Sequence, residues 1–352
     1  MIKAILFDWG DTLMRVLPQF HGAMVDWPKV EAIPGIQNAC KNLAQDYKLY
    51  LATNASESGP EKVRAALARV EMDQYFTQIF TAHNLGCSKP SRSFYEKILT
   101  TLGSSPEEVL MVGDDFQSDV VGSAKVGIRS IWFVPDGLSD IRSIPIQSGE
   151  VISMDGLFRT INNLATFPIP TVPECESLLR TYANDPNLLR HVKMVALAAY
   201  MMAELCRENG HSIDPILAHR GGLLHDLDKL ICLGSASEHG QVANRILQDK
   251  GFSKLGRISI SHPAFTLLDP EKAPATLEER IVYIADKLVD GDQIVGLKAR
   301  VANLRDRYPR DIVKFNLCEP LMQDLENETL SQMELDEPRL IEFLNRKISL
   351  MQ

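Results

Sequence analysis

The chain has 352 residues, which is longer than a single hydrophobic core usually extends, so two domains are expected. Hydrophobic residues make up 45% and charged residues 24%, the composition of an ordinary globular protein. The net charge of −9 argues against a broad surface for nucleic acid or for an anionic membrane, although a local basic pocket for a phosphate is compatible with it.

The beginning of the chain and its cysteines favour a cytoplasmic protein. The apolar run Ile2–Phe7 is too short for a signal peptide, and no later run reaches the roughly 18 apolar residues of a membrane span. The six cysteines show neither a C-x-x-C pair nor the spacing of a disulfide framework. We therefore interpret them as reduced thiols, as is usual in the cytoplasm.

Residues 1–135 alternate short apolar runs with helical stretches. The expected strands are Ala4–Phe7, Leu49–Ala52, Gln78–Thr81, Val109–Val112 and Ser130–Val134. Helical patterns such as Pro60–Val70 and Ser93–Leu102 lie between them. Strands that alternate with helices pair in parallel through crossovers, so the first domain, residues 1–165, is predicted to be an α/β doubly wound parallel sheet.

The character of the sequence changes after a proline-rich stretch. Phe167–Pro173 holds three prolines in seven residues, and we predict an extended linker over residues 166–173. Residues 174–352 then form a second domain with few strand candidates. Its long helical runs are Leu188–Arg207, Asp214–Leu230 and Leu277–Val289. This domain is predicted to be all-α.

Two carboxylates follow the first expected strand. Asp8 and Asp11 stand in Phe7-Asp8-Trp9-Gly10-Asp11-Thr12, and open α/β sheets bind ligands beyond the carboxyl ends of their strands. One carboxylate can attack phosphorus, while the other protonates the leaving oxygen and later activates water. On their own, the same residues could equally form an Asx turn between a strand and a helix.

Three later segments supply what a phosphoryl site needs. Thr53 and Asn54 end the second strand with a hydroxyl and an amide suited to phosphoryl oxygens. Lys89 supplies a cation that can offset the charge of the nucleophile and the phosphate. Asp114 and Asp119 form an acidic cluster suited to Mg²⁺, which prefers oxygen ligands. Each fragment alone is more often structural, but their order at strand ends favours a catalytic site.

Residues 1 to about 165 resemble a haloacid-dehalogenase-like phosphatase. The resemblance implies that Asp8 is the nucleophile and Asp11 the general acid and base. It further implies that Thr53, Asn54 and Lys89 bind the phosphoryl group. The residues implied to hold Mg²⁺ are Asp8, Gly10 through its carbonyl, Asp114 and Asp119. An aspartate at the general-acid position favours phosphatase over dehalogenase chemistry.

The spacing of these motifs leaves no room for a full cap domain of that family. About forty residues separate Asp8 from Thr53, and about thirty-five separate Thr53 from Lys89. The segment Leu13–Ile33 can form at most a small lid. A member without a cap would be open to larger substrates, or another domain, such as the C-terminal one, would cover the site.

Four histidines and two aspartates of the second domain fall in a suggestive order. They are His191, His225, Asp226, His239, His262 and Asp286. Mixed imidazole and carboxylate ligands suit transition ions better than Ca²⁺, and six of them can hold two ions for in-line attack on phosphorus. A lone histidine such as His191 is more often a packed or surface residue. The adjacent pair His225-Asp226, predicted to lie within a helix, shifts the interpretation towards a metal site.

Residues 174 to about 300 resemble the HD superfamily, in the branch with the signature His-Asp-Ile-Gly-Lys. The signature here is His225-Asp226-Leu227-Asp228-Lys229, so Asp228 replaces a small residue. The resemblance implies a first metal site of His191, His225, Asp226 and Asp286. His239 and His262 match the additional ligands of dinuclear members, including the HD-type diadenosine tetraphosphate hydrolases. One or two ions of Mn, Fe, Zn or Ni are implied, with Lys229 as a candidate for holding phosphate or water; Lys287 and Arg300 are weaker candidates.

Together these patterns predict a bifunctional phosphohydrolase. The first half would be a Mg²⁺-dependent phosphomonoesterase, and the second would hydrolyse a phosphoester or phosphoanhydride of a nucleotide. Two alternatives stay open: the second half could be a nucleotide-sensing regulatory module, or the first half could be a docking platform for an active second half. The expected partners are small phosphorylated substrates rather than membranes or nucleic acid, and an oligomer is compatible with the sequence.

Overall fold

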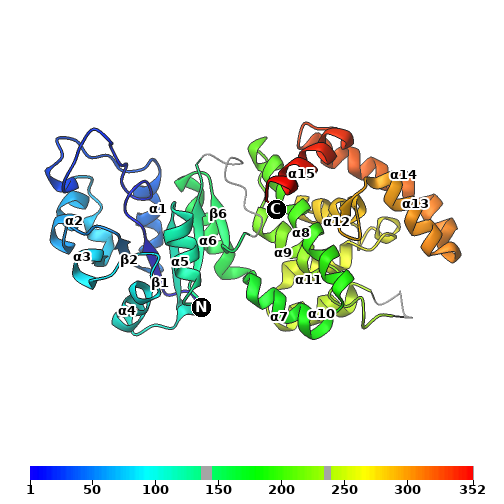
Figure 1. Ribbon diagram of the computed structural model, residues 1–352, viewed down its shortest axis with the longest axis horizontal. Coiled ribbons are helices and arrows are strands. Elements are labelled where there is room, and N and C mark those ends of the chain that lie inside the picture. The colour runs from blue at the N-terminus through cyan, green and yellow to red at the C-terminus, as the bar shows by residue number, and fades with distance from the viewer. Residues whose placement is uncertain (136–144, 234–238, 352) are drawn as a thin grey trace. The chain divides into compact units, whose positions relative to one another are not determined.

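The computed structural model describes residues 1–135, 145–233 and 239–351 and divides the chain into two compact units (Figure 1). Among the described residues, unit 1 comprises 1–135 and 146–166, and unit 2 comprises 145, 167–233 and 239–351. The predicted linker 166–173 needs correction at both ends. Thr166 is the last residue of helix α6, and helix α7 begins at Val172. Proline is tolerated in the first turn of a helix, and the Thr171 side chain caps α7 by accepting a hydrogen bond from the Glu174 N–H.

Unit 1 is built on a six-stranded sheet in which every neighbouring pair is parallel. Its strands are β1 (Ala4–Phe7), β2 (Lys48–Thr53), β3 (Phe76–Thr81), β4 (Val109–Gly113), β5 (Arg129–Phe133) and β6 (Gly149–Val151). The order β3-β2-β1-β4-β5-β6 confirms the predicted doubly wound sheet. The sequence did not predict β6, whose three residues are too few to show a strand pattern.

The register brings the ends of β1, β2 and β4 to one edge of the sheet. Phe7, the last residue of β1, lies opposite Leu51 of β2 and Val112 of β4. The strand order reverses around β1, which is where open α/β sheets bind their ligands. Every residue of β1 is buried, as expected for a parallel strand covered on both faces.

Helices and short turns connect the strands of unit 1. They are α1 (Ile36–Leu43), α2 (Pro60–Ala68), α3 (Ala82–Leu85), α4 (Arg92–Leu102), α5 (Gly122–Ala124) and α6 (Leu157–Thr166), with η1 (Met24–Asp26), η2 (Asp73–Tyr75), η3 (Pro106–Glu108), η4 (Phe116–Val121) and η6 (Met154–Gly156). On one face of the sheet, Phe94 and Ile98 of α4 pack against Leu6 of β1 and Met111 of β4. Helices α1 and α6 contact each other. This packing fixes the strand ends that carry the candidate site.

In the described residues of unit 2, the only strands are one short antiparallel pair, β7 (Val289–Asp290) with β8 (Gln293–Ile294), and the regular structure is otherwise helical. Its helices are α7 (Val172–Tyr182), α8 (Pro186–Glu208), α9 (Pro215–Leu224), α10 (Gln241–Asp249), α11 (Ser253–Ser261), α12 (Leu277–Leu288), α13 (Leu297–Arg307), α14 (Ile312–Ser331) and α15 (Glu337–Met351), with turns η8 (Thr266–Leu268) and η9 (Pro309–Asp311). Asp185 and Asp214 cap α8 and α9 from the residue before a first-turn proline.

Helices α8, α9 and α12 contact one another and form the centre of unit 2. A close approach between α8 and α9 depends on Gly222, where an added Cβ would lie 2.5 Å from the Cα of Ala196. Any larger residue at position 222 would separate the two helices. The C-terminal end of α9 is thereby held against α8, the helix that carries His191.

All six cysteines are free thiols, in agreement with the sequence analysis. Among the described helices, none is long and apolar enough to cross a membrane.

A buried carboxyl group in α14 gives unit 2 a pH-dependent stability. Glu326 is 1% exposed, and burial, followed by the nearby Glu337, raises its pKa to about 7. The folded state therefore holds the proton more tightly than the unfolded chain, so stability is highest at low pH and falls as pH rises from about 4.5 through about 7. We expect Glu326→Gln to raise the free energy of unfolding relative to wild type by on the order of 2–3 kcal/mol at pH 8, and little at pH 4.

Glu328→Gln is the matched control, because Glu328 lies on the same helix with its side chain 65% exposed. Thermal unfolding at both pH values measures the effect. A stability difference between wild type and Glu326→Gln that does not change with pH would contradict the expectation.

Candidate active sites

Three carboxylates of unit 1 meet where β1 and β4 end. One oxygen from each of Asp8, Asp114 and Asp119 lies within 4.8 Å of the other two. Asp8 and Asp114 directly follow their strands, and Asp119 is a buried residue of η4. Gly113 permits this approach, because an added Cβ there would lie 2.1 Å from Asp119 Oδ2. The structure thus brings together three of the residues predicted to hold Mg²⁺.

Lys89 lies between two of these carboxylates. Its Nζ is 2.5 Å from Asp8 Oδ1 and 2.6 Å from Asp119 Oδ1. Burial alone would lower the pKa of Lys89, but the two carboxylates raise it above its ordinary value, so the lysine is charged. Burial also raises the pKa of Asp119 to about 8 and that of Asp114 to about 6. One lysine does not offset three crowded acids, and a divalent cation fits this set.

Hydrogen bonds around the cluster hold its members in place. Thr12 Oγ1 donates to Asp114 Oδ1 over 2.7 Å. The Oδ1 atom of Asn54 accepts from the Lys89 N–H at 2.8 Å, and its Nδ2 donates to the Lys89 carbonyl at 3.2 Å. The structure therefore places Asn54 as a support for the Lys89 loop, while its predicted contact with substrate stays a prediction. Thr53 ends β2, and its Oγ1 accepts from the Ala55 N–H.

Asp11, the predicted general acid, stands apart from this cluster. It is exposed, has a left-handed backbone with φ of 52°, and accepts a hydrogen bond from the Val16 N–H through Oδ1 at 2.9 Å. Its other carboxylate oxygen forms no hydrogen bond with the described residues. Burial and neighbouring charges, that of Asp11 among them, raise the pKa of Asp114, so Asp11 lies within electrostatic reach of the site.

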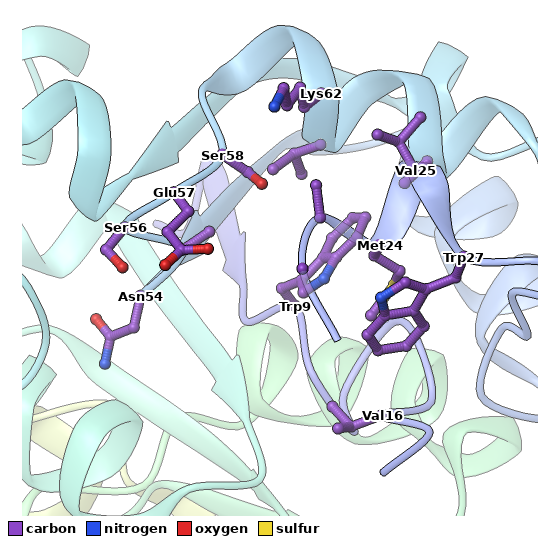
Figure 2. Close-up of a pocket in the computed structure, with 15 residues that line it drawn as sticks. Trp9, Val16, Met24, Val25, Trp27, Asn54, Ser56, Glu57, Ser58 and Lys62 are labelled. Carbon is purple, nitrogen blue, oxygen red and sulfur yellow. The ribbon is translucent and has the colours of Figure 1, made fainter. Parts of the chain in front are cut away.

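Unit 1 also holds a cavity of about 330 Å³, whose lining includes Trp9 and Asn54, the residues that follow Asp8 and Thr53. Residues from segments 9–27 and 54–66 line it (Figure 2). The first segment contributes Trp9, which directly follows Asp8, and Trp27; the second contributes polar residues such as Glu57. The segment predicted to form a small lid is thus one wall of this cavity. Its pattern of aromatic residues was visible in the sequence, but the opposing wall was not.

Four histidines of unit 2 are each oriented by a hydrogen bond at Nδ1. The partners are Gly291 O for His191 (3.1 Å), Gly222 O for His225 (2.8 Å), Ser259 O for His262 (2.8 Å) and Asp228 Oδ1 for His239 (2.8 Å). Since these oxygens only accept, Nδ1 carries the hydrogen and Nε2 is directed to the site, as in histidines that bind metals. His225 Nε2 is buried without a hydrogen-bond partner among the described residues.

Asp226 lies between two groups of candidate ligands. One group is His191, His225 and Asp226, and the other is Asp226, His239 and His262. Asp226 Oδ2 is 3.5 Å from His225 Nε2 and 3.9 Å from His191 Nε2. Its Oδ1 is 3.1 Å from His239 Nε2 and 3.3 Å from His262 Nε2. Each oxygen faces one group, an arrangement that fits a carboxylate shared between two metal ions.

Asp286 of α12 joins the first of these groups, with Oδ1 3.0 Å from His191 Nε2 and 3.7 Å from His225 Nε2. Burial would raise the pKa values of Asp226 and Asp286, but nearby lysines and histidines hold both well below the ordinary range. Both carboxylates are therefore ionised, as metal ligands must be.

Two lysines contact these carboxylates. Lys229 Nζ donates to Asp226 Oδ2, and Lys287 Nζ donates to Asp286 Oδ2. The Lys287 side chain is 3% exposed and also donates to the His262 carbonyl, so it holds the site together. The Lys229 side chain is 39% exposed, and its predicted contact with phosphate or water stays a prediction. Lys287 was a weaker candidate in the sequence analysis because a lysine on a helix is usually solvated.

Protonation differs between the two histidines of the second group. Burial lowers the pKa of His262 to about 3, so this histidine is neutral. Burial also lowers the pKa of His239, but hydrogen bonds with Asp226 and Asp228 outweigh it and raise the value to about 9. A metal ion at this group would displace the His239 proton.

The predicted helix through the His225-Asp226 pair is wrong at its end. Helix α9 ends at Leu224, and residues 225–233 form turns rather than a helix extending to Leu230. Asp226 and Asp228 are buried there and find partners outside α9, which outweighs local helix propensity. The turns allow His225 and Asp226 to face one site, which a regular helix would separate by about 100°.

Asp228, which replaces the small residue of the signature, has three hydrogen-bond donors. Its Oδ1 accepts from His239 Nδ1, and its Oδ2 accepts from the N–H groups of Gly240 and Ala243 at 2.8 and 2.9 Å. It therefore fixes both the His239 ring and the start of α10. The sequence left this role uncertain because the acceptor and its donors are separated by a turn.

We expect Asp228→Asn to weaken metal binding at the group of Asp226, His239 and His262 by about 10–100-fold, the usual effect of removing the partner of a metal-binding histidine. Metal titration of the apoprotein should then show one ion retained at the other group. Asp249→Asn, an exposed aspartate at the end of α10, is the control. Equal loss at both groups would instead indicate a general structural defect.

These two units define a chain that combines an α/β domain bearing an acid cluster with a helical domain bearing a histidine and aspartate cluster. Residues 5–133 match the family of haloacid dehalogenase-like hydrolases, and residues 188–289 match the HD domain. The chain therefore belongs to both: it is a fusion of a haloacid dehalogenase-like hydrolase domain with an HD domain.

Individual relatives resemble parts of the chain. It is 37% identical over 102 residues to the pyrimidine 5'-nucleotidase PynA of Streptococcus pneumoniae, covering 28% of this chain and 40% of the relative. It is 29% identical over 101 residues to a glyceraldehyde 3-phosphate phosphatase of Pyrococcus furiosus, covering 29% of this chain and 41% of the relative. An uncharacterized protein of Methanocaldococcus jannaschii is 35% identical over 146 residues, which are 38% of this chain and 85% of the relative. The chain spans about two fifths of the length of the first two.

Proposed function

We propose that the chain is a bifunctional phosphohydrolase. Unit 1 would hydrolyse phosphomonoesters, and unit 2 would hydrolyse a phosphoester or phosphoanhydride bond of a nucleotide. The observation that carries the proposal is that each unit gathers its own set of metal-binding side chains. Relatives of part of the chain are named as a nucleotidase and a sugar-phosphate phosphatase, which supports small phosphorylated substrates.

In unit 1, an oxygen of Asp8 attacks phosphorus and forms an acyl phosphate as the ester P–O bond breaks. Asp11 gives its proton to the leaving oxygen, so the alcohol departs neutral. Asp11 then takes a proton from water, whose oxygen attacks phosphorus and displaces Asp8, releasing inorganic phosphate. Thr53 and Lys89 hold the phosphoryl oxygens. Mg²⁺ bound by Asp8, Asp114 and Asp119 would offset the negative charge of the site.

The role of Asp11 is tested by varying the leaving group. Asp11→Asn should lower hydrolysis of an alkyl phosphomonoester such as glycerol phosphate by about 10²-fold or more, because the alkoxide then departs without a proton. Hydrolysis of p-nitrophenyl phosphate, whose leaving group is stable as an anion, should fall much less. Steady-state phosphate release measures both rates. If both substrates lose activity equally, or neither does, Asp11 is a turn residue that holds Val16 rather than an acid.

In unit 2, the residues proposed to hold the ions are the four histidines with Asp226 and Asp286. One or two ions of Mn, Fe, Zn or Ni would supply Lewis acidity towards the oxygens on phosphorus. Asp228 fixes His239, and the partial exposure of the Lys229 side chain supports a contact with a phosphate of the substrate. The oriented Nε2 atoms support a metal-dependent hydrolase.

The proposal is tested by removing and restoring metals. A chelator should abolish phosphate release from both phosphomonoesters and nucleotides. Mg²⁺ alone should then restore phosphomonoester hydrolysis, while Mn²⁺ or Fe²⁺ should be needed for the second activity. Transition metal that binds unit 2 without any turnover, across nucleotides and dinucleoside polyphosphates, would favour the alternative of a regulatory module.

We also propose that the protein acts in the cytoplasm on small phosphorylated molecules. The six free thiols support a reducing compartment. Fractionation of cells that produce the tagged chain would test the location.

A further inference from the structure

The cavity lined by Trp9, the residue after Asp8, has one aromatic wall. Trp9 and Trp27 line it, and each is 8% exposed, so each indole is largely packed and presents only a small part of its surface to the cavity (Figure 2). Met24 and Val25 extend the same apolar wall. Such a surface matches a planar ring, since stacking against an indole requires a flat partner.

This wall is held in a fixed position. Arg69, which follows α2, donates to the carbonyls of Trp27 and Val25 at 2.6 and 3.0 Å. Trp27 Nε1 donates to the His21 carbonyl at 3.2 Å, and its ring lies 5.8 Å from that of Phe20. A site ordered before binding loses little entropy when a ligand enters. The aromatic wall is therefore already ordered before a ligand enters the cavity.

The opposite side of the cavity is polar. Ser56, Glu57, Ser58 and Lys62 line it. Glu57 forms no salt bridge or hydrogen bond with any described residue, so its carboxylate can accept from hydroxyl groups of a ligand. Figure 2 shows this carboxylate between Asn54 and Ser58.

We propose that this cavity binds the nucleoside part of a nucleoside monophosphate, with the base against Trp27 and Trp9 and sugar hydroxyls donating to Glu57. The inference rests on the proposed phosphomonoesterase function of unit 1 and names its substrate class. Trp9 follows Asp8 and Asn54 follows Thr53, so the cavity lining includes the chain neighbours of two residues proposed to act on the phosphate. A polyol phosphate would leave that wall unused.

The test uses the full chain with Asp8→Asn, loaded with Mg²⁺, so that ligands bind without turnover. All three tryptophans, Trp9, Trp27 and Trp132, belong to unit 1, so tryptophan fluorescence reports on this site and not on unit 2. Uridine and adenosine 5'-monophosphates are compared with glycerol phosphate, which has the same phosphate but no ring. We expect nucleoside monophosphates to bind at least about 10-fold more tightly, from stacking of the base.

Variants of the cavity lining test whether the aromatic and polar walls cause the preference for nucleoside monophosphates. Trp27→Leu should weaken nucleoside monophosphate binding by about 10-fold and glycerol phosphate binding by less than about 2-fold. Trp27→Phe, which keeps an aromatic ring, should retain most of the wild-type affinity for the nucleoside monophosphate. Glu57→Gln, an exposed position that does not threaten folding, should also weaken only the nucleotide. Glu61→Gln, an exposed neighbour outside the cavity lining, is the control. Equal affinity of wild type for both ligands, or parallel losses for both, would overturn the proposal.

Turnover separates this inference from the function on which it rests. The assay uses an Asp226→Asn background, which silences unit 2. If this protein hydrolyses no phosphomonoester with Mg²⁺, the proposed phosphatase function fails. If it hydrolyses glycerol phosphate and nucleoside monophosphates with equal kcat/KM, the phosphatase function stands and the nucleoside assignment is wrong.

Discussion

Replacing Asp8 by Asn is expected to lower phosphomonoester hydrolysis by about 10³-fold or more, because the amide cannot attack phosphorus. The change is nearly isosteric and leaves an oxygen that can still accept from Lys89 Nζ, which lies 2.5 Å from Asp8 Oδ1. Lys89 also keeps its second partner, Asp119, at 2.6 Å. The fold of unit 1 should therefore survive. Phosphate release from phosphomonoesters with Mg²⁺ measures the loss, and acid quenching of wild type with labelled substrate should trap phosphate on the protein.

Asp46→Asn, at an exposed position just before β2 and at the opposite end of that strand from Thr53, is the matched control and should retain full activity. Nucleotide hydrolysis that survives Asp8→Asn would belong to unit 2, since the two ligand sets lie in different units. If Asp8→Asn keeps its phosphomonoesterase activity and wild type traps no label, the aspartyl-phosphate mechanism is wrong.

The fold of unit 1 was predictable because its strands are short apolar runs that end in polar motifs. Ala4–Phe7 was predicted with its observed bounds, and the other four predicted strands each overlap an observed one. Strand β6 was not predicted because Gly149 and Glu150 give no apolar pattern. This segment is a strand because it pairs with β5. The predicted continuation of α9 to Leu230 failed for a related reason: tertiary contacts of Asp228 decide where the chain turns.

The candidate sites were predictable where residue type and order carry the chemistry. Asp8 lies far from Asp114 and Asp119 in the sequence, but the parallel register of β1 and β4 dictates that Asp8 and Asp114 meet. The sequence could not predict how the side chains of these residues are oriented. The Nδ1 contact of His191 is with Gly291, one hundred residues away, and the cavity beside Trp27 needs a facing wall that only folding provides. Asp11 has the expected residue type, yet its hydrogen bond to Val16 is a local backbone feature.

Replacing Asp226 by Asn is expected to remove metal from both groups of unit 2 and to abolish its hydrolytic activity. Its two oxygens face different groups, 3.5 Å from His225 Nε2 on one side and 3.1 Å from His239 Nε2 on the other. An asparagine keeps one acceptor oxygen, so it cannot serve both, and its neutral charge leaves Lys229 without its carboxylate partner. We expect apparent metal affinity to fall by more than the roughly 10–100-fold typical of residues that only support a ligand.

Comparison of three variants makes this expectation specific to a shared ligand. Asp228→Asn should lose metal at one group, Asp226→Asn at both, and the exposed control Asp249→Asn at neither. Metal analysis after dialysis gives the stoichiometry, and thermal unfolding shows whether each variant is folded. A folded Asp226→Asn protein that retains two ions would show that Asp226 does not join the groups. The other outcome is that the Asp226→Asn protein loses both ions and keeps its Asp8-dependent phosphomonoesterase activity unchanged. That result would establish that the two sites bind their metals independently.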